Sequence, residues 1–182
     1  MNNIRSIAQE HLFENLQGFA VCDTLPAEIR SKKGVREMEK AKIDAVAYHE
    51  AGHAFVAVMT GKIRVKKVFY DGAEGYTETE WLSGNINFEK LCFFLAGEIA
   101  EYRLSENFSE INSGIDRKNT EDVLFLISGK REEQYAFWLK AIKTVNEWID
   151  DPKNAEKIKK IAEELMLKAT LPEEDIRTIM NR

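Results

Sequence analysis

The chain has 182 residues and a mass of 20.9 kDa, a size typical of one domain with at most a small appendage. Hydrophobic residues make up 44% and charged residues 31%, which is the composition of a soluble globular protein and excludes a wholly disordered chain or a fibrous rod. The net charge is −5, so a protein whose main task is to neutralise nucleic-acid phosphates is excluded as well.

The composition also bears on location. No apolar stretch reaches the roughly 18 residues of a membrane span, and the residues after Met1 lack the pattern of a signal peptide. Two cysteines, Cys22 and Cys92, lie far apart beside apolar residues, which favours two reduced, buried thiols over one disulfide. These features predict a cytoplasmic protein that engages neither membranes nor nucleic acids.

Helical periodicity dominates the first part of the chain. Residues 3–17 carry apolar side chains at helical spacing, and a long helix is predicted over residues 35–60 with Gly61 as its C-terminal stop. We therefore assign residues 1–40 to an N-terminal helical extension and residues 41–182 to the main domain.

The spacing of apolar residues changes from a helical to an alternating pattern after Gly61. Apolar and basic residues alternate over Ile63–Tyr70, and Asp71–Gly75 supplies turn residues before a second alternating stretch, Tyr76–Trp81. This pattern predicts a β-hairpin.

Beyond the hairpin the spacing is helical again. Apolar residues recur every three or four positions from Phe88 to Tyr102, and again in three stretches after a polar loop expected at Ser105–Ser113. Asp151-Pro152 separates the last two of these helices, and Thr170 is predicted to cap a short terminal helix with Glu173 as its capping-box partner. The predicted fold class is mostly α with one small β-sheet (α+β).

Two of the three histidines, His49 and His53, lie four residues apart in the predicted long helix. Side chains at this spacing lie on one helix face, so both imidazoles can bind one ion. Glu50 directly follows the first histidine, where its carboxylate can take the proton of a water that the ion activates. The segment predicts a hydrolytic zinc site with an open fourth position.

The alternative interpretation is a packed histidine pair beside an exposed glutamate. The flanking residues are mostly apolar and would be costly surroundings for unpaired polar groups. Ala51 and Gly52 are small, which allows another segment to approach the helix closely. We therefore favour the metal site.

Two histidines leave a divalent ion incompletely coordinated, and no histidine follows His53. The third ligand must then be a carboxylate or a thiolate. The candidates are Glu98, Glu101, Asp116, Asp122 and Cys92, the last of which falls on the apolar stripe of its helix.

The stretch Ala47–Ala54 resembles the zinc-binding segment of the FtsH protease domain, the proteolytic part of an ATP-dependent zinc metalloprotease. Further similarities follow in chain order at Val65–Val68, Gly75–Thr77, Leu95–Glu101 and Leu165–Leu171 with Ile176. The resemblance covers about residues 40 to 180. It implies a zincin-like helical fold of the FtsH-protease type, a Zn²⁺ cofactor and polypeptide substrates.

In that family the third zinc ligand is an aspartate that follows a Ser/Thr-Gly pair at the start of a helix. Ser113-Gly114 precedes Asp116 here, at a distance two residues shorter than in the family. The resemblance implies Asp116 as the third ligand in preference to Asp122, which would require an insertion. Asp116 is also suited to be a helix N-cap.

The chain departs from the family at several points. Glu98 stands where the family has an arginine, and Tyr102 stands where it has a second glutamate. Glu101 matches the family's glutamate at its position and is a candidate partner that orients a histidine ring. The Gly-Lys pairs, Gly61-Lys62 and Gly129-Lys130, lack the spaced glycine of a phosphate loop, and only 48 residues precede His49. We expect neither the ATPase module nor the membrane anchor of that family.

The sequence thus predicts an ATP-independent zinc endopeptidase in which His49, His53 and Asp116 bind Zn²⁺ and Glu50 is the general base. Its expected substrates are unfolded or flexible protein segments, bound as a strand along Val65–Tyr70 or Tyr76–Trp81. A separate unfoldase or a second copy of the chain is a possible partner. Two other functions stay open: a non-catalytic metal-binding regulatory module and a metal-free helical interaction protein.

Overall fold

The computed structural model describes residues 32–82, 84–105 and 113–181, with side chains for 45–82, 84–105 and 114–181. The predicted helix over residues 3–17, most of the 1–40 extension, Cys22 and most of the expected Ser105–Ser113 loop lie outside the described residues. The chain separates into two compact units, Met1–Arg36 and Glu37–Arg182, and the structure below is that of the second unit.

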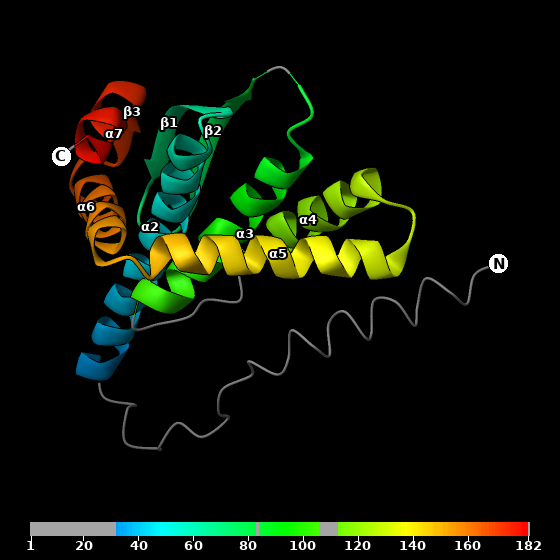
Figure 1. The fold of residues 1–182 in the computed structure, drawn as a ribbon. Helices are drawn as coiled ribbons and strands as arrows, with labels where there is room; N and C mark the ends of the chain where they lie inside the picture. Colours follow the sequence, from blue (N-terminus) through cyan, green and yellow to red (C-terminus); the bar gives the residue numbers. More distant parts are fainter. Residues whose placement is uncertain (1–31, 83, 106–112, 182) are drawn as a thin grey trace. The chain divides into compact units, whose positions relative to one another are not determined.

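The described part is mostly helical with one small sheet, so the predicted α+β class is confirmed (Figure 1). In chain order the elements are α2 (Lys32–Thr60), β1 (Ile63–Tyr70), β2 (Gly75–Trp81), α3 (Asn87–Leu104), α4 (Ser113–Ile127), α5 (Arg131–Ile149), α6 (Pro152–Lys168), β3 (Thr170–Pro172) and α7 (Glu173–Met180). The long helix begins three residues earlier than predicted, and none of the described helices is long and apolar enough to cross a bilayer.

The predicted hairpin forms, with β1 and β2 antiparallel from Ile63 opposite Trp81 to Tyr70 opposite Gly75. The Asp71 carboxylate accepts hydrogen bonds from the backbone N–H groups of Ala73 and Glu74, both at 2.9 Å, and thereby holds the turn.

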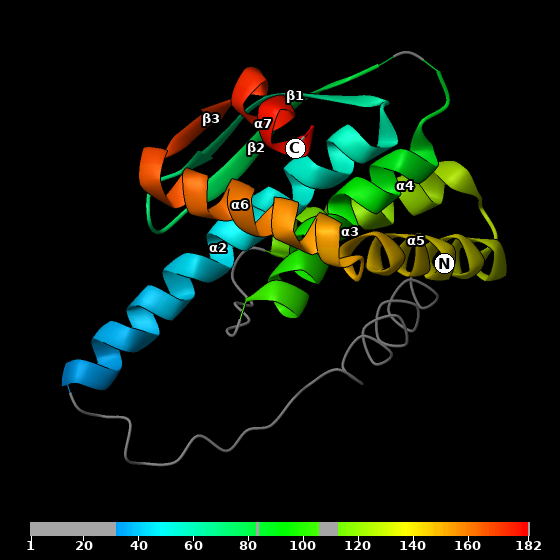
Figure 2. The ribbon, with the colours of Figure 1, turned by 60° about the vertical axis from the view of Figure 1, so that its left-hand side comes forward.

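A third strand, β3, was not predicted. The capping box of Thr170 and Glu173 is wrong, because Thr170 lies in β3 and the residue at the N-cap of α7 is Pro172. Ala169 ends α6 in the left-handed conformation, with φ of 60°, and turns the chain back along β1 (Figures 1 and 2). Since Leu171 then pairs with Val68, a contact 103 residues away in sequence is needed to define this strand.

The strand order β2-β1-β3 decides which strands lie at the edges of the sheet. β1 is the central strand, and β3 pairs with its residues Lys67–Phe69, so this part of the expected binding edge along Val65–Tyr70 is already occupied. Among the described strands, β2 and β3 are the two edge strands, each with a partner on one side only, and β2 (7 residues) is longer than β3 (3 residues).

Helix α2 lies between this hairpin and α3. A Cβ added at Gly52 of α2 would stand 2.5 Å from the carbonyl oxygen of Ala96 in α3, so the absence of a side chain permits this approach. On the other side, a Cβ at Gly75 of β2 would stand 2.6 Å from Cγ of Glu50. Both glycines bring neighbouring elements close to the predicted site on α2.

Helices α4 and α5 pack on α3, whereas α7 packs on α6, β1 and β3. Helices α4 and α5 both contact α3 and also contact each other, as Figures 1 and 2 show from two sides. Their junctions follow the predicted signals: the Asp151 side chain caps α6 by accepting from the N–H groups of Lys153 and Asn154, and Pro152 occupies the first turn. The first turn of α4 contains Asp116.

Candidate metal centre

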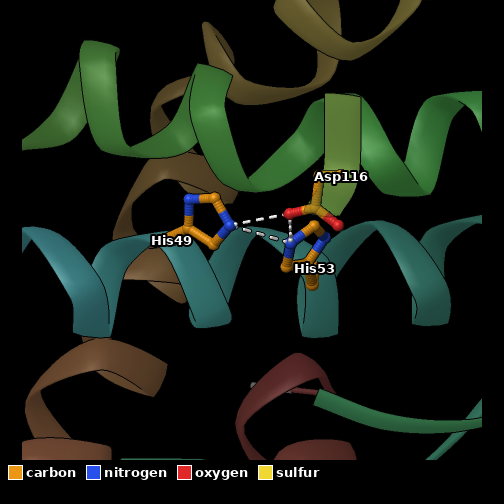
Figure 3. A group of neighbouring side chains, drawn as sticks. All are labelled: His49, His53 and Asp116. Atoms are coloured by element: carbon orange, nitrogen blue, oxygen red, sulfur yellow. Dashed lines mark hydrogen bonds and ion pairs between the residues drawn. The ribbon is translucent and has the colours of Figure 1, made fainter. Parts of the chain in front are cut away.

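Three side chains from the two helices α2 and α4 converge on one point (Figure 3). His49 and His53 lie one turn apart on α2 and are 2% and 4% exposed. Asp116 approaches them from α4, and its Oδ2 lies 3.0 Å from Nε2 of each histidine. The two Nε2 atoms are 3.1 Å apart. This group could hold a metal ion.

The outer nitrogens of both rings are already engaged. Nδ1 of His53 lies 2.8 Å from the carbonyl oxygen of Phe93, which can only accept a hydrogen bond, so this nitrogen carries the proton. Nδ1 of His49 lies 3.2 Å from Oε2 of Glu101 and likewise donates to it. In the neutral rings both Nε2 atoms are therefore acceptors. They face a third acceptor, the Asp116 carboxylate, and only a proton or a cation between them makes this arrangement favourable.

The triangle of Nε2, Nε2 and Oδ2 has nearly the dimensions that a small divalent ion requires. Two ligands at about 2.0–2.1 Å from a tetrahedral zinc ion lie roughly 3.3 Å apart. The observed separations of 3.0 and 3.1 Å need only a slight expansion. The donor set of two imidazoles and one carboxylate is that of hydrolytic zinc sites, and it leaves a fourth position open.

The charges of His49 and Asp116 stabilise each other. Burial opposes protonation of His49, but the carboxylates of Asp116 and Glu101 outweigh it and raise the pKa of His49 to about 10. Burial also opposes ionisation of Asp116, yet the adjacent imidazoles of His53 and His49 hold the pKa of this carboxyl well below its usual range. Without a metal ion the group retains a proton, which an arriving cation must displace.

Glu50 lies beside the two histidines and is 5% exposed. Burial raises the pKa of its carboxyl above the ordinary value, and the nearby His53 and His49 partly oppose this rise. The hydroxyl of Thr77, in β2, donates a hydrogen bond of 2.8 Å to Oε2 of Glu50 and lies 3.2 Å from its carbonyl oxygen. The candidate base is thus held by a hydrogen bond from the edge strand β2.

Two glycines make room for these side chains. A Cβ at Gly97 of α3 would stand 2.5 Å from Nε2 of both His49 and His53, so any side chain there would enter the metal group. The absence of a side chain at Gly75 likewise leaves room for the side chain of Glu50. Both glycines lie in stretches of the resemblance, and Gly75 also in the predicted turn, but neither was predicted to make room for the site, because a local pattern does not show which side chain a distant glycine faces. Thr77 was missed as a partner of Glu50 for the same reason.

The structure separates the five candidates for the third ligand. Asp116 is the one that joins the histidines, while Asp122 is exposed elsewhere on α4. Glu101 is buried and engages the outer nitrogen of His49, the orienting position anticipated for it. Glu98 forms an ion pair with Arg117 instead. Cys92 is a free, buried thiol whose pKa burial raises to about 12, and it is outside the group.

An aromatic side chain supports the second histidine. The ring of Phe93 lies against the imidazole of His53 with centroids 4.6 Å apart, and Trp81 of β2 contacts Phe93 edge-on at 5.3 Å. These contacts and the hydrogen bond to the Phe93 carbonyl leave the His53 ring one orientation. The supporting residues come from α3 and β2, which also provide Gly97 and Thr77.

Comparison with known proteins adds no identification. No protein-family model matches the chain, and the comparison with curated proteins found no match. The chemistry of this site therefore has to be inferred from its own geometry.

Proposed function

We propose that this protein is a zinc-dependent endopeptidase that hydrolyses peptide bonds in unfolded or flexible protein segments. The observation that carries the proposal is the position of Glu50. Its buried carboxylate follows a metal-ligand candidate on the same helix and is held by Thr77 from the edge strand β2. A packed histidine pair would not require a buried carboxylate at this place.

The residues have distinct roles in the proposed reaction. His49, His53 and Asp116 would hold the ion, which supplies Lewis acidity by lowering the pKa of a water and polarising the scissile carbonyl. The Glu50 carboxylate takes the proton of the attacking water and passes it to the nitrogen of the leaving amine. The raised pKa of Glu50 suits this task, because a base is most effective when its pKa lies near the working pH.

The substrate would bind as an additional strand on β2. Backbone hydrogen bonds of an extended peptide can continue a sheet at an open edge, and they do not depend on the peptide's sequence. Thr77 belongs to β2 and contacts Glu50, so a peptide along this strand lies close to the base. A folded substrate cannot extend in this way, which favours loops, tails and unfolded chains.

The resemblance to the FtsH protease domain agrees with this proposal in fold type, zinc and substrate class. The proposed setting is cytoplasmic, and a separate unfoldase or a second copy of the chain would present structured substrates. The chain's Gly-Lys pairs lack a phosphate loop, so the proposed cleavage does not use ATP at this site.

Replacement of Glu50 by glutamine tests the reaction. The amide keeps the shape of the side chain but cannot accept the proton, so we expect E50Q to bind zinc like the wild type and to cleave casein about 10²–10⁴-fold more slowly. Phenanthroline should abolish wild-type cleavage. Full activity of the zinc-loaded variant would contradict the mechanism. Zinc binding by a wild type that leaves casein intact would instead indicate the non-catalytic metal-binding module.

A further inference from the structure

We propose that Arg117 and Glu98 are positioning residues that fix the metal ligand Asp116 in place through an ion pair between α4 and α3. The inference rests on the metal centre of the proposed function. It concerns the two residues that directly follow Asp116 and Gly97, which are themselves parts of that centre. The proposed metal site thus has one supporting residue on α4, Arg117, and one on α3, Glu98.

The pair has the geometry of a firm contact. Nη2 of Arg117 donates to Oε1 of Glu98 at 2.8 Å, and the side chains are 34% and 26% exposed. Nε of Arg117 is buried, with no hydrogen-bond partner in the part of the chain that the structure describes. The guanidinium is therefore partly withdrawn from water, where an ion pair is stronger than on an open surface.

The first turn of α4 has little other support among the described side chains. Gly114 is exposed and Ile115 is 76% exposed. The buried side chains of α4 begin one turn later, with Thr120, Val123 and Leu124. Asp116 lies in the weakly packed turn, and Arg117 gives this turn an ion pair to α3. A ligand must be held within about half an ångström of its place to bind tightly, so this pair bears directly on metal affinity.

An effect of the Arg117 charge and an effect of its position predict opposite changes in metal affinity when the arginine is removed. If Arg117 acted only through its field, its loss would remove a positive charge near the site and strengthen cation binding. If it positions Asp116, its loss weakens binding. The sign of the change therefore identifies the mechanism.

The experiment measures Co²⁺ binding to the full chain from the visible absorption of the bound ion, which also reports the coordination number. We expect R117Q and E98Q each to weaken Co²⁺ binding about tenfold, as other supporting residues of metal sites do. The exchanged pair E98R/R117E should recover to within about threefold of the wild type, because the ion pair is restored with its direction reversed.

Arg103 provides the matched control. It lies on the same helix as Glu98 and pairs with Asp150 at 2.6 Å, at the end of α5 rather than on α4. We expect R103Q to bind Co²⁺ like the wild type. Equal effects of R103Q and R117Q would overturn the inference, because they would show a general loss of helix packing.

Three further outcomes would overturn it: unchanged or tighter Co²⁺ binding by R117Q, no recovery in the exchanged pair, or no Co²⁺ binding by the wild type. The last would remove the metal centre as well. A wild type that binds Co²⁺ but cleaves no peptide would overturn the proposed reaction and leave the positioning role to be decided by the same variants.

Discussion

The hydroxyl of Thr77, in the edge strand β2, is hydrogen-bonded to the carboxylate of Glu50, the candidate base. The Thr77 hydroxyl donates to Oε2 of Glu50 at 2.8 Å, and it comes from the strand along which we propose that the substrate lies. A change in β2 therefore reaches the carboxylate of the candidate base through one hydrogen bond.

Removal of this hydroxyl should slow catalysis without affecting the metal. A hydrogen bond to a charged group contributes about 1.5–3 kcal/mol, so we expect T77V to lower kcat roughly tenfold or more. The hydrogen bond also lowers the pKa of Glu50, so the acid limb of the kcat profile should move to higher pH in T77V. T77S keeps the hydroxyl and should behave like the wild type. An unchanged kcat in T77V would show that the contact has no part in the reaction.

The identity of the third ligand can be tested with two aspartates of one helix. We expect D116N to weaken zinc binding by at least about tenfold, because a neutral amide is a poorer ligand and loses the attraction to the cation. Asp122 is exposed on the same helix, and D122N should bind zinc like the wild type. Isothermal titration would measure both. Loss of affinity in D122N alone would reverse the assignment.

Gly97 should tolerate no side chain. The Cβ of G97A would stand 2.5 Å from both ligand nitrogens, so α2 and α3 must move apart or the rings must turn. We expect zinc binding to fall by two orders of magnitude or more, in line with a displaced ligand pair. Gly129 has open space around it and serves as the control, since G129A meets no atom within 4 Å. Wild-type affinity in G97A would contradict the close contact.

Metal binding should release a proton at neutral pH. A pKa of about 10 means that His49 is protonated at pH 7 in the metal-free protein, whereas the bound ion needs its neutral ring. The apparent affinity should therefore rise with pH, by up to about tenfold per unit below that pKa. Titration calorimetry in two buffers of different ionisation enthalpy would count the protons released. An affinity that is constant between pH 6 and 8 would contradict the shifted pKa.

The local pattern of the chain was enough to predict α2, the hairpin and the junction of α5 with α6. Each depends on residues close in sequence: the stop at Gly61, the turn at Asp71 and the cap at Asp151-Pro152. The pairing of His49 and His53 belongs with these, because the helix itself brings them to one face. The strand β3 could not be predicted, since three residues become a strand only when β1 is beside them.

The sequence by itself determined a helix that carries two histidines and a glutamate at the spacing found in hydrolytic zinc sites. Only the tertiary structure decided which of five candidates completes the group, which acid orients His49, and which glycine leaves room for the rings. The physical reason is distance along the chain: Asp116 is 67 residues from His49 and Glu101 is 52 residues away. Such contacts depend on how whole helices pack, and no local spacing specifies that packing.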